Sequence, residues 1–273
     1  MPHAAVAATT LTASTLLLAP EYRLPPLGEL PSVRLAIVID DVGYNLSRAE
    51  RILALPRELT LGLLPYAPHT LEIAERAASS GRELILHQPM EPLAGAEHEP
   101  GTLELGMSSE RFAAELAASL ARLPQVSGVN NHTGSLLTAH REPMEWLMRG
   151  IARHGLYFLD SRTTPDSVAE STARELAVPT IKRDVFLDHV QSEDFLAGEF
   201  ERSIAIARRK GYAVVIAHPH QITLDFLERR LARLPADVRL ATLGALVRRP
   251  SDPDRTTLAL LESPGSRSRS PVR

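Results

Sequence analysis

From residue 33 onward, short apolar runs alternate with longer amphipathic segments. The apolar runs are continuous and do not alternate with polar residues, which is typical of parallel strands that are covered on both faces. They span residues 34–40, 59–65, 82–87, 126–132, 156–160, 179–184, 212–218 and 238–243. The pattern therefore predicts a parallel sheet in which a helix follows most of the strands.

Four of the intervening segments have a clear helical pattern. Residues 108–123 place their large apolar side chains on one stripe, with Ser109 as the candidate N-cap. Residues 142–155 and 194–211 each end at a glycine, which suits the end of a helix. Residues 223–234 form the last of the four predicted helices.

Seven or eight β/α units in about 210 residues fit one closed or nearly closed parallel barrel. A doubly wound open sheet is the alternative, but that fold commonly carries a glycine-rich phosphate loop after its first strand. Here the first strand is followed by the residues DDVG. We therefore favour the barrel.

Polar and ionisable residues stand where the predicted strands end. They are Asp40 and Asp41, His87, Asn130 to His132, Asp160 to Arg162, Arg183 and Asp184, and His218 to His220. A single histidine at a strand end is more often a hydrogen-bonded structural residue. In a parallel barrel, however, all these ends converge on one mouth, where barrel enzymes have their active sites. The repetition predicts a shared site.

The residue types at these ends suit a divalent metal ion. The chain has no cysteine, so a metal must be held by His, Asp, Glu or Asn. Imidazoles with a carboxylate are a typical ligand set for zinc, and a catalytic zinc has three protein ligands and an open position. Such an ion lowers the pKa of water and polarises a carbonyl group. A nearby carboxylate and a separate histidine can then act as general base and general acid.

Six segments in series resemble one known family. IVIDDVGYN, LHQPMEP, GVNNHTGS, FLDSRTT, RDVFLD and VIAHPHQIT together look like the divergent polysaccharide deacetylase family, over residues 35–247. Its members are bacterial proteins related to the NodB-type carbohydrate esterases. The resemblance implies a distorted (β/α) barrel of about seven parallel strands, a metal-dependent activity and a polysaccharide substrate.

The resemblance also implies roles for individual residues. In the wider deacetylase group an aspartate pair supplies a base and then a metal ligand, which here gives Asp40 as base and Asp41 as ligand. The group then has two histidines four residues apart, but the fourth residue after His87 is Glu91. We predict that His132, from another strand, replaces the missing histidine, so that Asp41, His87 and His132 bind a divalent metal. The resemblance implies that this metal is zinc.

The other residues follow from the later segments. His218 matches the general acid, and either Glu91 or His220 is the reserve for the third metal ligand. Six residues are predicted to bind substrate or orient the catalytic groups: Glu91, Asn131, Asp160, Arg162, Arg183 and Asp188.

The ends of the chain differ from the barrel region at 33–249. Residues 1–32 have an apolar stretch but no Lys or Arg before Arg23, so we expect either a disordered leader or a poor secretory signal. The apolar run is too short for a membrane span. Residues 250–273 are rich in Ser, Arg and Pro and predict a disordered tail. The family resemblance implies a periplasmic or secreted protein of the cell envelope, whereas the poor signal leaves a cytoplasmic location open.

Three functions are compatible with the sequence. The leading hypothesis is a hydrolase that removes acyl groups, most simply N-acetyl, from a polysaccharide. The loss of the paired histidines suggests instead an inactive barrel that acts as a carbohydrate-binding or envelope-interaction module, although aromatic residues, at 4%, are few for stacking on sugars. A glycosidase with Asp40 and Asp160 as its carboxylate pair is the third. The net charge of −3 gives no reason to expect nucleic acid as a partner.

Overall fold

The computed structural model describes residues 32–93 and 98–247. The predicted C-terminal tail and, apart from Ser32, the predicted leader lie outside these residues, so the boundaries at 33 and 249 stay predictions. Within the described ranges, no helix combines the length and the apolar composition that crossing a bilayer requires.

One parallel sheet of nine strands forms the centre of the fold. The strands are β1 (Val33–Val42), β2 (Thr60–Leu63), β3 (Leu84–Met90), β4 (Gly128–Thr133), β5 (Tyr157–Asp160), β6 (Thr180–Lys182), β7 (Val185–Phe186), β8 (Tyr212–Ala217) and β9 (Val238–Leu240). Their order is β6-β5-β4-β3-β2-β1-β8-β7, and β9 pairs with the first residues of β1. Each of the eight predicted apolar runs overlaps one strand, and β7 is an additional strand.

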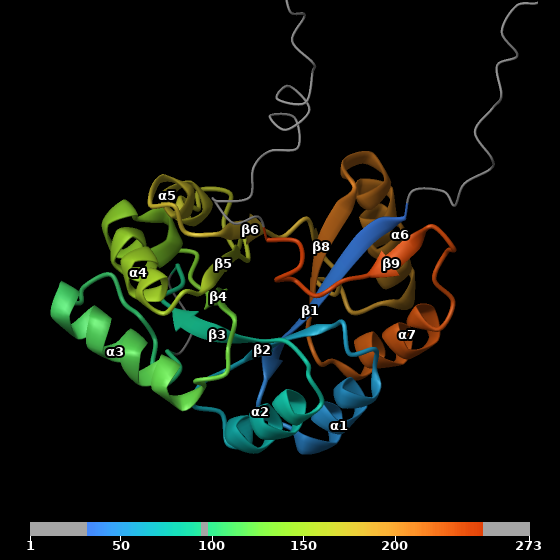
Figure 1. Cartoon of the computed structure of the whole chain (residues 1–273), viewed down its shortest axis with the longest axis horizontal. Coiled ribbons are helices and arrows are strands. Elements are labelled where there is room, and N and C mark those ends of the chain that lie inside the picture. The colour runs from blue at the N-terminus through green and yellow to red at the C-terminus, as the bar shows by residue number, and fades with distance from the viewer. Residues whose placement is uncertain (1–31, 94–97, 248–273) are drawn as a thin grey trace, which may run out of the picture. The chain divides into compact units, whose positions relative to one another are not determined.

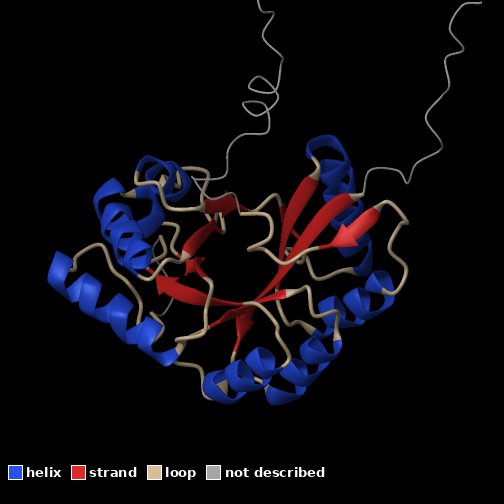
Figure 2. Cartoon of the chain, viewed as in Figure 1, coloured by secondary structure: helices blue, strands red, loops and turns tan. Residues whose placement is uncertain are grey.

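The chain itself connects the two ends of this strand order. β6 pairs with β5 and β7 pairs with β8, yet only Arg183 and Asp184 separate β6 from β7. The amide of Arg183 donates to Asp160 O at 3.0 Å on one side, and that of Asp184 donates to Val214 O at 2.9 Å on the other. β6 and β7 thus act as one interrupted strand that curls the sheet into a distorted barrel, which confirms the predicted fold. Figure 2 shows the strands arranged in a ring with the helices outside it.

The helices cover the outer face of the sheet (Figure 1). They are α1 (Leu46–Ala54), α2 (Thr70–Ser79), α3 (Ser109–Arg122), α4 (Arg141–Arg153), α5 (Ala169–Glu175), α6 (Glu193–Lys210) and α7 (Gln221–Leu231), with a 3-10 turn at Leu137–Ala139. The four predicted helices are α3, α4, α6 and α7. The N-cap of α3 is Ser108 and not the predicted Ser109, because the Ser108 side chain accepts a hydrogen bond from the amide of Arg111.

Two apolar layers follow from the alternation of side chains along each strand. The larger layer packs between the sheet and the helices. The smaller one brings together residues from β1, β3, β5, β6 and β8, which can meet only inside the barrel: Ala36, Val38, Ile85, Tyr157, Leu159, Ile181, Val214 and Ile216. Leu243 and Leu246 join this inner layer and close the amino end of the barrel. At the carboxyl end, the same inward-facing register continues into Asp40, His87 and Asn130, so polar side chains enter the interior there.

Candidate metal centre and active site

The end of β1 is irregular in a way that turns both of its aspartates toward one site. Neighbouring residues of a regular strand point to opposite faces, but Asp41 has φ 55° and the β1–β2 register shifts between Ile39 and Val42. As a result both carboxylates reach His87: Asp40 Oδ1 lies 3.6 Å from Nδ1, and Asp41 Oδ1 lies 3.2 Å from Nε2. Gly62 on β2 makes room for Asp40, since a Cβ there would lie 2.0 Å from Oδ1.

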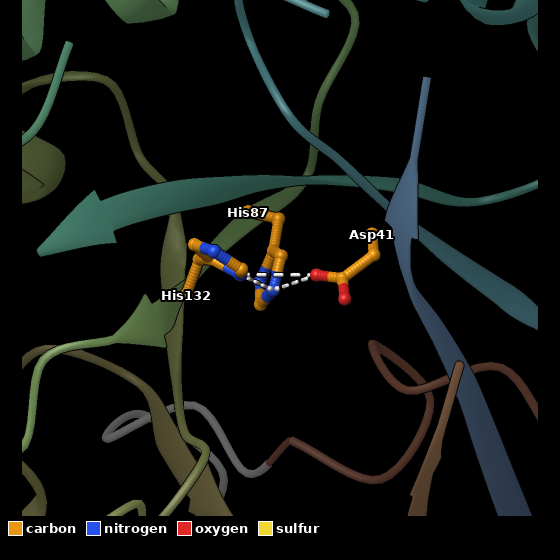
Figure 3. Close-up of side chains that lie close together, drawn as sticks. All are labelled: Asp41, His87 and His132. Carbon is orange, nitrogen blue, oxygen red and sulfur yellow. Dashed lines mark hydrogen bonds and ion pairs between the residues drawn. The ribbon is translucent and has the colours of Figure 1, made fainter. Parts of the chain in front are cut away.

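Asp41, His87 and His132 form a compact triangle of donor atoms (Figure 3). Asp41 Oδ1 lies 3.0 Å from His132 Nδ1 and 3.2 Å from His87 Nε2, and the two nitrogens are 3.1 Å apart. Asp41 and His132 lie near the ends of β1 and β4, and His87 lies in the middle of β3. The structure therefore brings together the three residues that the sequence predicted as metal ligands.

This triangle passes a simple test of fit for a metal ion. Asp41 Oδ1 is buried and accepts no hydrogen bond of good geometry, although two imidazole nitrogens lie close to it. Donors around a tetrahedral zinc ion, bound at about 2.0–2.1 Å, lie about 3.3 Å from one another. The observed separations of 3.0–3.2 Å are close to that value. One carboxylate and two imidazoles suit zinc and similar divalent ions.

A buried asparagine fixes the ring of His87. The Asn130 amide group donates to Asp40 Oδ2 at 2.8 Å and to Ser161 Oγ at 3.1 Å. Its oxygen therefore accepts from His87 Nδ1, 2.9 Å away. With Nδ1 protonated, the lone pair of Nε2 points to Asp41 and His132, as metal binding requires.

The prediction named Asn131 and missed Asn130. Alternation from Gly128 could have found it, because residues 128, 130 and 132 share the inward face of β4. Asn131 borders the cavity at the mouth, but its side chain connects loops. It accepts from the amide of Ser161 at 2.9 Å and donates to Thr133 O at 2.8 Å.

His218 and Asp188 form a hydrogen-bonded pair on the opposite side of the mouth. His218 Nδ1 lies 2.9 Å from Asp188 Oδ1, and Asp188 Oδ2 accepts from the backbone amide of His218 at 2.6 Å and from Thr223 Oγ1 at 2.9 Å. This leaves His218 Nε2 facing the cavity, 4.0 Å from Asp41 Oδ2.

Asp188, His218 and His220 lie close enough together to suggest a second metal site. Because both oxygens of Asp188 already accept hydrogen bonds, we read the group as an oriented histidine and not as a ligand set.

The charges of the site change the pKa values of its groups. Burial raises the pKa of Asp40, although His87 and His218 oppose the effect. Burial also raises the pKa of Asp41, but His132 and His87 lower it by more. The pKa of Asp41 is therefore held well below its usual range. Burial lowers the pKa of His87, but Asp40 and Asp41 raise it to about 9. Burial also lowers the pKa of His218, but Asp188 raises it by more, so the pKa of His218 lies above its usual value. The same carboxylates that favour a proton on His87 also favour a metal cation.

The mouth contains a cavity of about 460 Å³, a size typical of small-ligand sites. Its lining includes Asp40, Asp41, His87, Asn131, His132, Arg162, Arg183, Phe186, Ile216 and His218. Arg183 donates to Ser161 O at 2.6 Å and to Arg162 O at 2.8 Å, and so holds the loop after β5.

The backbone is strained at three residues around the cavity. φ is 51–55° at Asp41, Thr133 and Arg162, each of which lies at or next to the end of a strand. Such backbone strain in residues other than glycine is concentrated at functional sites.

Of the six residues predicted to bind substrate or orient the catalytic groups, Asp188, Asp160 and Glu91 do not line this cavity. Asp188 acts through its hydrogen bond to His218. Asp160 is fully buried on the outward face of β5, where its carboxylate accepts from the Arg162 amide at 2.8 Å and from Ser167 Oγ at 2.8 Å. The carboxylate pair that a glycosidase would need, Asp40 with Asp160, is therefore not formed. Glu91 accepts from the amide of Leu105 at 2.7 Å and is not part of the donor triangle.

Comparisons with known proteins identify the family of this chain. The family model described as divergent polysaccharide deacetylase matches residues 37–247. The uncharacterized Escherichia coli protein YibQ is 38% identical over 217 residues, which cover 80% of this chain and 68% of YibQ. An uncharacterized Haemophilus influenzae protein is 38% identical over 215 residues, covering 79% of this chain and 77% of that protein.

A solved structure agrees with the fold. The crystal structure of the uncharacterized protein ATU2773 from Agrobacterium tumefaciens superposes with a TM-score of 0.74 at 26% identity, over 81% of this chain and 92% of that one. The extent of the family match, which includes every residue of the donor triangle, establishes that this chain belongs to the divergent polysaccharide deacetylase family.

Proposed function

We propose that the protein is a metal-dependent hydrolase that removes a short acyl group, most simply N-acetyl, from a glycan. The observation that carries the proposal is the convergence of three kinds of group on one cavity. These are the donor triangle, the buried carboxylate of Asp40 and the oriented imidazole of His218. Membership of a family described as polysaccharide deacetylases supports the reaction type and the substrate class. The envelope location stays a prediction.

Asp41, His87 and His132 would hold the ion, whose chemistry is to polarise the acyl carbonyl group and to lower the pKa of water. Asp40 is the general base. Asn130 binds its Oδ2, whereas its Oδ1 is buried and without a hydrogen-bond partner, so Oδ1 is the atom that takes the proton from the attacking water. A carboxyl pKa raised by burial makes Asp40 a stronger base than an exposed aspartate.

His218 is the general acid. Asp188 fixes the ring and raises its pKa, so that Nε2 carries a proton into the cavity. This proton passes to the nitrogen of the leaving amine as the carbon–nitrogen bond breaks, and the water oxygen remains on the released acid. Phe186 and Ile216 give the cavity an apolar wall beside His218, which suits the methyl group of an acetyl substituent.

The change from the wider deacetylase group concerns the third ligand. The paired histidines of that group are replaced by His87 and His132, which lie on neighbouring parallel strands. The donor set thus remains two imidazoles and one carboxylate, and this favours a hydrolase over an inactive binding module.

The test is a panel of N-acetylated and O-acetylated glycans incubated with metal-free protein and added zinc, cobalt or nickel. The proposal expects metal-dependent release of acetate from at least one glycan and no cleavage of the glycan chain. Binding of a glycan without release of acetate under any of these ions would instead support the binding module.

A further inference from the structure

The outer nitrogen of His132 has a charged neighbour outside the donor triangle. His132 Nδ1 faces Asp41 and His87, so Nε2 points away from the donor triangle. Glu99 Oε1 lies 3.7 Å from this Nε2. Within residues 32–93 and 98–247, Glu99 is the one carboxylate at ion-pair distance from Nε2. The two side chains are 18% and 30% exposed, so the contact is only partly open to solvent.

A histidine that binds a metal needs its second nitrogen protonated, and a carboxylate or carbonyl partner usually fixes that proton. Asn130 does this for His87 at 2.9 Å. His132 binds through the other ring nitrogen, so its partner must lie on the Nε2 side. Glu99 is on that side. At 3.7 Å its carboxylate acts on Nε2 as a charge, and a small side-chain adjustment would bring it to hydrogen-bond distance.

The backbone that carries Glu99 is firmly held. Glu99 O accepts from the Thr102 amide at 3.1 Å and from Thr102 Oγ1 at 2.6 Å. Gly101 has φ 83°, and its carbonyl accepts from Gln88 Nε2 at 2.8 Å. Gln88 follows His87 directly on β3. The turn is thus tied to a strand that supplies one of the metal ligands.

The Glu99 carboxylate also affects the pKa of Tyr44, on the loop after β1. Burial, and then the charge and hydrogen bonding of Glu99, raise the pKa of Tyr44. The charge of Glu99 thus acts on Tyr44 as well as on His132. Neither the sequence pattern nor the family resemblance singled it out.

We propose that Glu99 is a positioning residue for His132. Its carboxylate favours the tautomer of His132 with the proton on Nε2 and orients the ring so that the lone pair of Nδ1 faces Asp41 and His87. The assignment rests on the metal centre of the proposed function and adds to it a group that does not itself touch the ion.

The first test is the affinity for zinc of three proteins freed of metal: the wild type, Glu99→Gln and Glu104→Gln. Glu99→Gln keeps the shape of the side chain and removes its charge. Glu104 is the matched control, because it lies in the same segment and also pairs with a histidine. Its Oε1 lies 2.9 Å from Nδ1 of His98, which is not part of the donor triangle. We expect Glu99→Gln to bind zinc about 10–100-fold more weakly, the range for partners of metal-binding histidines. Glu104→Gln should keep the wild-type affinity.

The second test reads the tautomer of His132 from the ¹⁵N chemical shifts of its ring in the metal-free proteins under mildly alkaline conditions. Asp41 Oδ1 lies 3.0 Å from Nδ1 and competes with Glu99 for the ring proton. The wild type and Glu104→Gln should therefore show a mixture of both tautomers, and Glu99→Gln should shift toward the tautomer with the proton on Nδ1. Unchanged shifts together with unchanged zinc affinity in Glu99→Gln would overturn the assignment, as would an equal loss of affinity in Glu104→Gln. If the wild type bound no divalent ion, the proposed function would fail, while the tautomer measurement would still decide the role of Glu99.

Discussion

The two ends of the barrel both contain buried or half-buried carboxylates, but they differ in how those carboxylates are satisfied. At the amino end, Glu83 accepts from Thr60 Oγ1 at 2.8 Å, from the Tyr157 hydroxyl at 3.1 Å and from the Gly244 amide at 3.0 Å. At the carboxyl end, Asp40 Oδ1 and Asp41 Oδ1 are buried without a hydrogen-bond partner. Leaving a buried polar atom unpaired costs stability.

The comparison teaches that a charged residue in the barrel is not by itself a sign of function. Glu83 closes a network that also binds the segment after β9, which covers the amino end of the barrel. The aspartates at the carboxyl end have unused acceptor atoms in a strained segment with a non-glycine φ of 55°. We therefore expect substitutions at the carboxyl end to change chemistry and those at the amino end to change stability.

The largest effect should come from Asp40→Asn. The change keeps the side-chain shape and the hydrogen bond from Asn130 but removes the atom that takes a proton. We expect kcat to fall about 10²–10⁴-fold, the usual contribution of a general base. Zinc affinity should remain within a few-fold of wild type.

Asp40→Asn should also leave the free energy of unfolding unchanged or raise it. Burial raises the pKa of Asp40, which means that its ionised form costs the folded state free energy at neutral pH. Chemical denaturation of both proteins measures this difference. A clear loss of stability would assign Asp40 a structural role.

At the amino end, Glu83→Gln should give the reverse result. The amide group of glutamine would face a hydroxyl or backbone donor where Glu83 has an acceptor oxygen. Loss of that match should lower the free energy of unfolding by about 1–3 kcal/mol. Zinc content and acetate release should stay as in wild type, and a change in either would break the proposed division between the two ends.

The smallest effect is a pH dependence of stability at Tyr157. Burial, followed by the charge of Glu83, raises the pKa of the Tyr157 hydroxyl well above its ordinary value of 10.0. A raised pKa means that the folded state favours the protonated form. Its contribution is complete below about pH 10 and is lost at about 1.4 kcal/mol per pH unit as the pH rises above that value. Denaturation of wild type and Tyr157→Phe across this range should show the steeper decline in wild type alone.

Much of the fold could be predicted because periodicity depends on local sequence. Continuous apolar runs identified the strands, and the position of polar residues after them identified the mouth. The same reasoning brought Asp41, His87 and His132 to one place, since the ends of parallel strands meet at one side of a barrel. The short helices α1, α2 and α5, of 9, 10 and 7 residues, were not among the four predicted helices.

Side-chain direction was harder to predict than position. Asp40 and Asp160 both lie near the end of a strand. Asp160 nevertheless faces outward, because side chains alternate along β5 and its neighbour Leu159 faces inward. Asp41 would also face away in a regular strand, and only its left-handed backbone returns it to the site. Glu99 reaches His132 through a turn after β3 whose geometry depends on contacts with distant residues. No short-range pattern contains that information.

The measurement that tests the central claim most directly is the metal content of the wild type beside Asp41→Ala and His132→Ala, all purified in the same way and then dialysed against zinc. The account predicts one tightly bound ion per wild-type chain and none in either variant, with the fold of both variants intact by circular dichroism. An equal metal content in all three proteins would contradict it.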